Sequence, residues 1–207
     1  EFQILDWIQS IRTPLGDVVI PWISALGNAG MIWIVLAAIL LLIPKTRKSG
    51  VILALALCVD VLMCNVILKN VFARIRPCDV NTAVQLLIAR PVDFSFPSGH
   101  TAASFASAAA LFFAGERKLW KPVLVLAGLI AFSRLYLYVH YPTDVLAGAL
   151  IGFLCGKAAL FLWKSRVFQR FSTRRNSAPS DVENLAALHS SGEKALYSWE
   201  EPVKKEK

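Results

Sequence analysis

Long apolar stretches with few charges dominate the first 163 of the chain's 207 residues. A helix needs roughly 20 mainly apolar residues to cross about 30 Å of hydrocarbon. Four stretches joined by short connections have that length, at about residues 50–72, 98–116, 121–139 and 143–163. The pattern therefore predicts an all-α fold: a polytopic integral-membrane helical bundle with five to six transmembrane helices.

The N-terminal region leaves the number of crossings open. Residues 18–43 carry no formal charge, but Pro21 and the run Gly27 to Gly30 interrupt their first half. They form either one kinked span or a short helix that turns into a span. Upstream, the apolar residues between positions 2 and 11 fall near one helical face, which is typical of an amphipathic helix at the membrane interface.

Composition favours the bilayer over water as the solvent of this chain. It is 56% hydrophobic and 17% charged, whereas soluble domains carry roughly 25% charged residues. The net charge of +8 would fit a nucleic-acid-binding protein if the basic residues covered one surface. Because the first 163 residues hold only 13 Lys/Arg and 8 Asp/Glu, we expect the lipid bilayer as a partner and no nucleic acid.

Basic residues predict the orientation of the chain in the membrane. They cluster at 45–48, 117–121 and 164–175, and counting spans puts all three clusters on one side. The positive-inside rule makes that side cytoplasmic and places segments 73–97 and 140–142 on the outer face. We therefore expect a multi-pass protein of a bacterial-type plasma (inner) membrane with a cytoplasmic C-terminal tail.

The same patterns divide the chain into three parts. Residues 1–29 are expected to form an N-terminal amphipathic or short helical region, and residues 30–164 the transmembrane core. Residues 165–207 are polar, with many Ser, Asn, Glu and Lys. They are expected to form a basic juxtamembrane segment and a mobile tail.

Charged residues at the outer ends of the spans form three sets, and charges at membrane depth need a reason. In the first set, Lys69 and Arg76 are seven residues apart, so an α-helix would place them on one face about 10 Å apart. Pro77 discourages that helix from continuing. Two cations on one face favour a bound anion, although each alone could snorkel to the headgroups. Asp60 would lie about 180° from Lys69 and face a neighbouring helix.

The second set is Ser98, Gly99 and His100 at the start of a predicted span. Ser98 suits the N-cap position. The unpaired N–H groups and the positive dipole end of a helix start favour an anion, and His100 in the first turn lies near the same place. A lone histidine there would otherwise be a structural residue.

The third set is Arg134, His140 and Asp144. The Asp144 carboxylate, four residues after His140, can accept a hydrogen bond from one ring nitrogen, which leaves the other nitrogen available as a nucleophile. The alternative is a structural His–Asp pair that braces a helix corner.

Together the three sets predict one outer site for phosphoryl transfer, since they supply three cations, a helix N-terminus and two histidines. We expect no cofactor and no metal there. Asp79 and Asp93 are isolated along the chain, and the four cysteines lack the spacing of metal ligands.

These residues form three motifs that resemble the signatures of the type 2 phosphatidic acid phosphatase superfamily, which also includes vanadium haloperoxidases. The motifs are Lys69-x6-Arg76-Pro77, Pro97-Ser98-Gly99-His100 and Ser133-Arg134-x5-His140-x3-Asp144, and the match covers roughly residues 14–164. Members of the family's membrane branch commonly have six spans, whereas the first span is short here.

The resemblance implies a role for each matched residue. His140 is the nucleophile that forms a phosphohistidine, Asp144 orients it, and His100 is the acid that protonates the leaving oxygen. The resemblance also implies a reaction that needs no metal. The phosphoryl oxygens are held by Lys69, Arg76, Ser98, Gly99 and Arg134.

The expected function is that of an integral-membrane lipid phosphatase whose partner is a membrane lipid phosphate. Undecaprenyl diphosphate is favoured as substrate, and phosphatidylglycerophosphate and phosphatidate are possible. Two alternatives stay open: a haloperoxidase-like enzyme, and a non-catalytic protein that binds or transports lipid phosphates. The sequence does not predict the oligomeric state.

Overall fold

The computed structural model describes residues 1–165, and the regular elements within them are all helical. Residues Glu1–Lys164 form one compact unit. The tail predicted for residues 165–207 lies outside the described residues from position 166 onward. The elements are α1 (Phe2–Ser10), α2 (Pro14–Leu26), η1 (Asn28–Gly30), α3 (Met31–Leu42), η2 (Pro44–Thr46), α4 (Arg47–Asp60), η3 (Val61–Leu68), α5 (Lys69–Phe72), α6 (Pro77–Val80), α7 (Gly99–Ala114), α8 (Trp120–Tyr136) and α9 (Pro142–Lys164).

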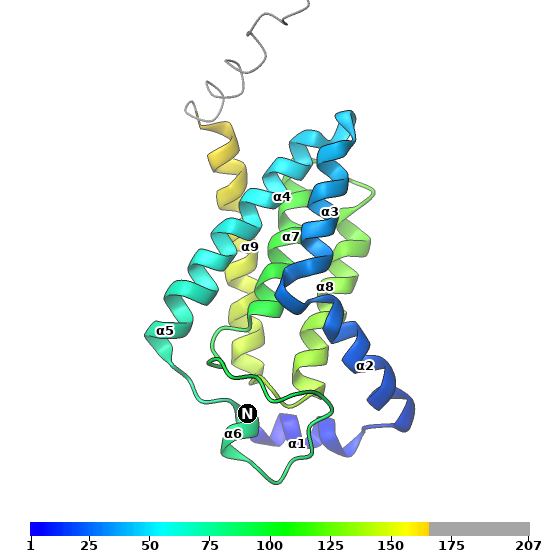
Figure 1. The fold of residues 1–207 in the computed structure, drawn as a ribbon, viewed down its shortest axis with the longest axis vertical. Coiled ribbons are helices and arrows are strands. Elements are labelled where there is room, and N and C mark those ends of the chain that lie inside the picture. The colour runs from blue at the N-terminus through cyan, green and yellow to red at the C-terminus, as the bar shows by residue number, and fades with distance from the viewer. Residues whose placement is uncertain (166–207) are drawn as a thin grey trace, which may run out of the picture. The chain divides into compact units, whose positions relative to one another are not determined.

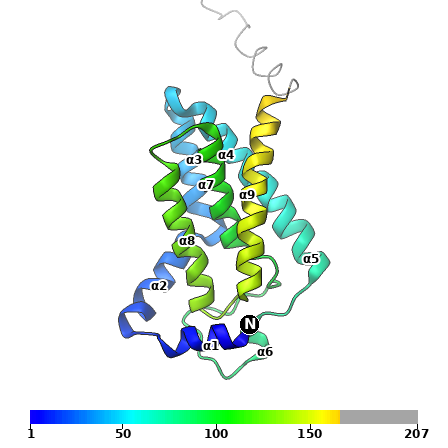
Figure 2. The same ribbon diagram turned by 180° about the vertical axis from the view of Figure 1, so that it is seen from behind.

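Helix α7 lies at the centre of the bundle, in contact with α4, α8 and α9 (Figures 1 and 2). Most of its side chains are small, and Ala102, Ala106 and Ala110 are fully buried. Small residues let neighbouring helices approach closely, which is how helices commonly associate in lipid. The alanine-rich sequence after Gly99 thus makes α7 the helix on which the others pack.

The contact between α7 and α9 depends on glycine. A Cβ atom added to Gly152 would lie 2.2 Å from the carbonyl oxygen of Ala102, and one added to Gly156 would lie 2.6 Å from Cβ of Ala109. The backbone of α9 therefore runs directly against α7. Because the last motif residue, Asp144, lies in the first turn of α9, this contact fixes where that carboxylate stands relative to the start of α7.

We expect Gly152→Ala to destabilise the protein by about 1–3 kcal/mol, because overpacking forces the two backbones apart. Thermal unfolding in detergent measures the change. Gly128→Ala in α8 is the matched control, since a Cβ there meets nothing within 4 Å. It should be neutral or stabilising by up to about 1 kcal/mol, because alanine is the better helix former. Equal melting temperatures for the two variants would contradict the proposed close contact.

The apolar stretch 18–43 is broken once, between α2 and α3, which meet at 44°. Ala29 and Gly30 have φ values of 50° and 67° there, in the left-handed region that ends a helix. Pro21 lies inside α2, which continues past it. The break is therefore at Gly27 to Gly30 alone, and the prediction that Pro21 also interrupts the stretch is wrong.

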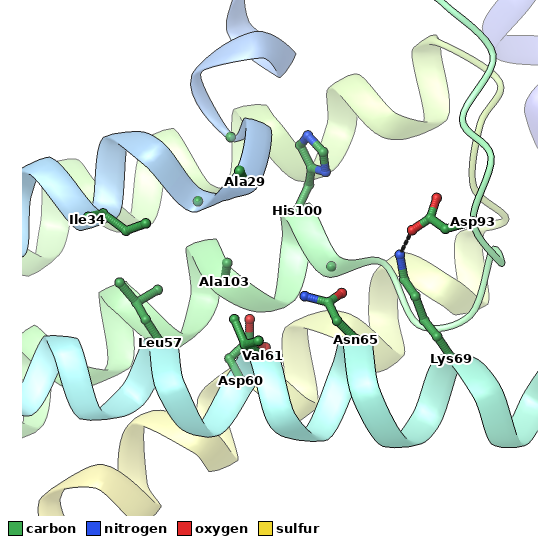
Figure 3. Close-up of a pocket in the computed structure, with 13 residues that line it drawn as sticks. Ala29, Ile34, Leu57, Asp60, Val61, Asn65, Lys69, Asp93, His100 and Ala103 are labelled. Atoms are coloured by element: carbon green, nitrogen blue, oxygen red, sulfur yellow. Dashed lines mark hydrogen bonds and ion pairs between the residues drawn. The ribbon is translucent and has the colours of Figure 1, made fainter.

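The helix that carries Lys69 changes its winding before it reaches that residue. Residues 61–68 form a π-helix, whose i→i+5 hydrogen bonds rotate the following side chains relative to a continuous α-helix. As a result Asp60 and Lys69 line the same cavity (Figure 3). The prediction that Asp60 faces away from Lys69, made for an unbroken α-helix, is wrong.

Two helical stretches, Pro44–Val80 and Pro142–Lys164, are long and apolar enough to cross a bilayer, and the bent pair α2–α3 adds a third if its halves form one span. Helices α7 and α8, with 16 and 17 residues, are shorter than the roughly 20 residues of a full crossing. The protein is thus an all-helical membrane protein, and the number of five to six crossings stays a prediction.

Helix α1 packs on the end of the bundle where α9 begins (Figure 2). Its Leu5 is fully buried in a cluster with residues of the α8–α9 connection, including Leu137 and Val139. The ring of Phe2 meets the ring of Tyr141 edge-on, with 5.5 Å between centroids. The apolar face predicted for residues 2–11 therefore supports the segment that carries His140.

Candidate active site

A cavity of about 410 Å³ opens at the end of the bundle where α7 begins. It gathers side chains from the α2–α3 break, α5, the segment between α6 and α7, α8 and the α8–α9 connection. Six of the eight predicted site residues line it: Lys69, Arg76, Gly99, His100, Arg134 and His140. The other two, Ser98 and Asp144, are fully buried and do not line it.

Lys69 and Arg76 do meet at one place, but not along a shared helix. Helix α5 ends at Phe72, and Ala73 adopts a left-handed φ of 44°. The chain then runs without helix to Pro77, so the prediction that a single helical face carries both cations is wrong. An irregular turn brings the guanidinium of Arg76 back toward Lys69 instead.

Asp93 lies between these two cations. Its Oδ2 is ion-paired with Lys69 Nζ (Figure 3), and its Oδ1 is 2.5 Å from an Nη atom of Arg76. Arg76 also donates through Nε to the backbone carbonyl of Asp93, at 2.8 Å. Asp79 in turn pairs with Arg90 at 2.8 Å. Folding thus brings cations that are distant in the sequence to both carboxylates.

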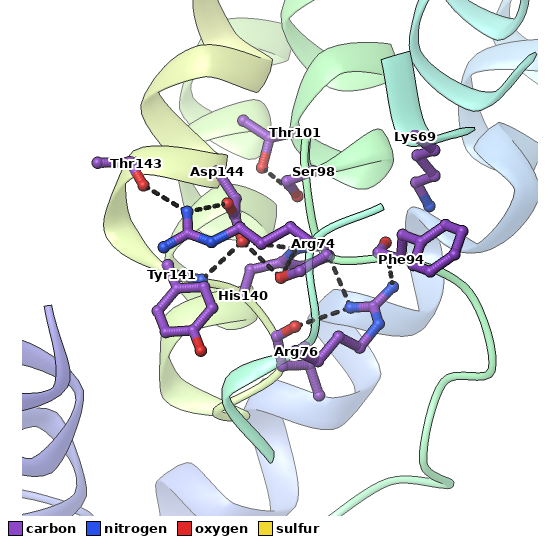
Figure 4. Close-up of polar contacts among 12 residues, drawn as sticks. Lys69, Arg74, Arg76, Phe94, Ser98, Thr101, His140, Tyr141, Thr143 and Asp144 are labelled. Carbon is purple, nitrogen blue, oxygen red and sulfur yellow. Dashed lines mark hydrogen bonds and ion pairs between the residues drawn. The ribbon is translucent and has the colours of Figure 1, made fainter. Parts of the chain in front are cut away.

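His140 is held between Arg76 and Asp144 (Figure 4). An Nη of Arg76 lies 3.1 Å from Nε2, and Nδ1 is 3.6 Å from Asp144 Oδ2. Since a guanidinium only donates, the contact assigns a lone pair to Nε2 and the proton to Nδ1. Burial lowers the pKa of His140 to about 3 although Asp144 opposes this shift. The imidazole is therefore neutral at neutral pH, and its Nε2 electron pair accepts from Arg76.

Asp144 is fixed by three donors that the sequence reasoning missed (Figure 4). Ser95 Oγ donates to Oδ2 at 2.5 Å, the backbone N–H of Tyr141 donates to Oδ2 at 2.9 Å, and Arg74 donates to Oδ1 at 2.7 Å. Arg74 also stacks on the ring of Tyr141, 3.8 Å from its centroid. A carboxylate held this way orients the ring of His140 and balances charge that develops on it.

His100 faces the cavity from the first turn of α7 and contacts the α2–α3 break. Its Nε2 lies 2.9 Å from Asn28 Oδ1, so Nε2 carries a proton. The contact is close enough that a Cβ added to Gly27 would lie 2.9 Å from Cδ2 of His100. Asn28 was not predicted as a site residue; its position in the glycine-rich break was the only sequence signal.

Arg134 and Ser98 complete the predicted set. The guanidinium of Arg134 is buried, with Nη1 at 2.5 Å from Ser24 Oγ and with Nε lacking a hydrogen-bond partner within residues 1–165. Ser98 is the N-cap residue of α7, as predicted, but its hydroxyl does not cap the helix. Its Oγ accepts instead from Thr101 Oγ1 at 2.9 Å. Arg134 thus offers unused donors to a ligand, whereas Ser98 is engaged within the protein.

A second cavity, of about 450 Å³, continues from the first toward the middle of the bundle (Figure 3). Lys69, Asp93, Gly99 and His100 line both cavities. Ile34, Leu57, Val61 and Ala103 make the deeper part mainly apolar. Among residues 1–165, no three His, Cys, Asp or Glu residues gather as metal ligands would. The arrangement suits a molecule with an anionic end and an apolar remainder.

Comparison with known proteins finds relatives that are named as lipid phosphatases. A Sulfolobus acidocaldarius protein, undecaprenyl-diphosphatase, is 35% identical over 121 residues, which cover 58% of each chain. The lipid A 4'-phosphatase of Bacteroides thetaiotaomicron is 32% identical over 164 residues, covering 72% of this chain and 71% of the relative.

Solved structures show the same arrangement of helices. Aquifex aeolicus LpxE superimposes with a TM-score of 0.67 at 32% identity, covering 77% of this chain and 93% of that one. A transmembrane PAP2-type phosphatidylglycerolphosphate phosphatase from Bacillus subtilis gives a TM-score of 0.64 at 27% identity, covering 79% and 85%. The model of the PAP2 superfamily matches residues 49–168, which include all three motifs. The chain belongs to the PAP2 superfamily.

Proposed function

We propose that the protein is an integral-membrane lipid phosphatase that works through a phosphohistidine and without a metal. The observation that carries the proposal is the cavity lined by two histidines and three cations: His100, His140, Lys69, Arg76 and Arg134. Binding alone needs cations, whereas a neutral imidazole oriented by a buried carboxylate is what nucleophilic catalysis requires.

In the first step the Nε2 lone pair of His140 attacks phosphorus. The P–N bond forms as the P–O bond to the lipid breaks, and His100, doubly protonated while the anionic phosphate is bound, gives one proton to the leaving oxygen. Lys69, Arg76 and Arg134 hold the equatorial oxygens, on which negative charge collects. Arg76 must turn from Nε2 toward these oxygens, which frees the lone pair for attack.

In the second step water attacks the phosphohistidine from the side that the leaving group has vacated. His100, now neutral, takes a proton from the water as the P–N bond breaks. The products are the dephosphorylated lipid and inorganic phosphate. Asp144 keeps the proton on Nδ1 throughout, so Nε2 of His140 returns to its starting state.

We propose a substrate that enters from the outer face, with undecaprenyl diphosphate favoured and phosphatidylglycerophosphate or phosphatidate as alternatives. The basic connections at 43–47 and 115–119 lie at the end of the bundle opposite α1 and α6 (Figure 1). The positive-inside rule makes that end cytoplasmic, in the plasma membrane of a bacterial-type cell. The Sulfolobus relative's name supports the polyprenyl diphosphate.

Phosphate release from a panel of purified lipids tests the proposal. The wild-type protein in detergent should release phosphate from at least one terminal lipid phosphate or diphosphate, and excess EDTA should leave the rate unchanged. Orthovanadate, which mimics pentacoordinate phosphorus, should inhibit. A rate abolished by EDTA and restored by a divalent cation would overturn the metal-free mechanism, and no release from any lipid would favour a binding or transport protein.

A further inference from the structure

The carboxylate of Asp93 occupies the place that the proposed function gives to the substrate's phosphoryl oxygens. One of its oxygens pairs with Lys69 (Figure 3), and the other pairs with Arg76. Two oxygens of one anion thus bridge two of the three phosphate-binding cations. Arg134, the third, has no carboxylate partner within residues 1–165.

Asp93 is ionised at neutral pH. Burial would raise its pKa, but the hydrogen bond and charge of Lys69, followed by those of Arg76, outweigh this and lower the pKa to about 2. A substrate phosphate therefore meets an ionised competitor and not a neutral acid. The phosphate must displace the Asp93 carboxylate from Lys69 and Arg76 before it can bind.

The side chain of Asp93 can leave the site without unfolding its segment. It is 50% exposed, so solvent reaches it directly. The backbone is held independently, by Arg76 on the carbonyl of Asp93 at 2.8 Å and by the Ser95 N–H on the carbonyl of Arg74 at 2.8 Å. Rotation of one side chain exchanges the carboxylate for another anion.

Charge decides which anion wins that exchange. A phosphodiester carries one negative charge, as does the carboxylate, so replacing Asp93 with a diester brings no additional charge to the cations. A terminal phosphate carries about two charges at neutral pH, and the extra charge near the cations favours its binding by about tenfold or more.

We propose that Asp93 is a specificity-determining residue, an internal anion that admits terminal phosphates and excludes the phosphodiester headgroups of ordinary membrane lipids. This inference rests on the proposed function. Exclusion of phosphodiesters matters for a membrane enzyme, because phosphodiester lipids surround the cavity at far higher concentration than any substrate. Three unopposed cations would be filled by those lipids.

Two non-hydrolysable inhibitors of equal chain length test the proposal. Dodecylphosphonate carries two charges at alkaline pH, and its monomethyl ester carries one. Inhibition of lipid-phosphate hydrolysis in detergent should favour the dianion by about tenfold or more in the wild type. In Asp93→Asn both phosphonates should bind about tenfold more tightly, because no carboxylate has to be displaced, and the monoester should then approach the affinity that the dianion has in the wild type. Addition of phosphatidylglycerol to the micelles should then inhibit this variant and spare the wild type.

Asp17→Asn is the matched control, because it also removes one carboxylate and one ion pair, that with Arg12, but touches none of the three cations. It should keep both inhibition constants at their wild-type values. A fall in kcat of Asp93→Asn, with both constants unchanged or weaker, would show that Asp93 only orients Lys69 and Arg76, and would overturn the proposal.

Two further measurements keep the test decisive. If Asp93→Asn does not fold, Asp93→Ser replaces it. Equal affinity of the wild-type protein for both phosphonates would overturn the inference without any variant. Direct calorimetric titration of the same phosphonates separates the two proposals. A strong preference for the dianion without any lipid hydrolysis would refute the proposed phosphatase activity and support the selectivity. Lipid hydrolysis without that preference would support the phosphatase activity and refute the selectivity.

Discussion

Replacing His140 with alanine is expected to lower kcat on the order of 10⁴-fold or more, to the rate of the cations acting alone. The Nε2 lone pair of the His140 imidazole faces Arg76 in the cavity, and the buried carboxylate of Asp144 orients the ring. Affinity for the lipid phosphate should change little, because the three cations remain. The measurement is steady-state phosphate release together with binding of a non-hydrolysable alkylphosphonate.

Direct detection of the intermediate makes the His140 prediction specific. Wild-type protein mixed with a ³²P-labelled lipid phosphate and quenched in alkali should carry a label that acid removes, as a phosphohistidine does. His140→Ala should carry none. His189→Ala, which changes the chain's third histidine, should be labelled like the wild type. Normal turnover by His140→Ala would refute the covalent mechanism and would require a water molecule as the direct nucleophile.

The helices themselves follow from the sequence, because an apolar run in lipid satisfies its backbone hydrogen bonds by forming a helix. The apolar runs begin and end within a few residues of α4–α5, α7, α8 and α9. The phase of side chains around those helices does not follow from composition. The π-helix between Asp60 and Lys69 replaces one hydrogen-bond pattern with another, and nothing in an apolar run distinguishes the two.

The candidate site was predictable where a residue's chemistry was out of place in its surroundings. Lys69, Arg134 and His140 are polar groups at the ends of apolar spans, and all three line the cavity. The meeting of Arg76 with Lys69 was also predicted, but for the wrong reason. Arg76 reaches Lys69 through an irregular turn with a left-handed Ala73, whereas the sequence argument used a continuous helix.

Residues that act through other residues escaped prediction. Ser95 and Arg74 hold Asp144, and Asn28 holds His100, across separations of 49, 70 and 72 residues. Such contacts come from packing and leave no periodic pattern. Asp93 escaped for another reason: a carboxylate in a loop looks solvated until two cations are found beside it.

The second large effect is expected from His100→Ala, which should lower kcat for lipid phosphates by about 10²–10⁴-fold. An alkoxide or a phosphate leaving group needs the proton that His100 supplies. p-Nitrophenyl phosphate does not, because p-nitrophenolate is a stable anion. The variant should therefore keep a nearly normal first step with this substrate while the second step stays slow, since no base activates water.

That imbalance predicts a burst. His100→Ala should release one equivalent of p-nitrophenol per active site and then stall as a phosphohistidine on His140, measurable by stopped-flow absorbance and by ³²P labelling. The double variant His100→Ala/His140→Ala should show no burst, because no nucleophile accepts the phosphoryl group. Equal losses on the lipid and the nitrophenyl ester, with no trapped intermediate, would mean that His100 only shapes the cavity. The burst therefore separates a proton donor from a structural histidine, a distinction that the hydrogen bond from Nε2 to Asn28 does not make by itself.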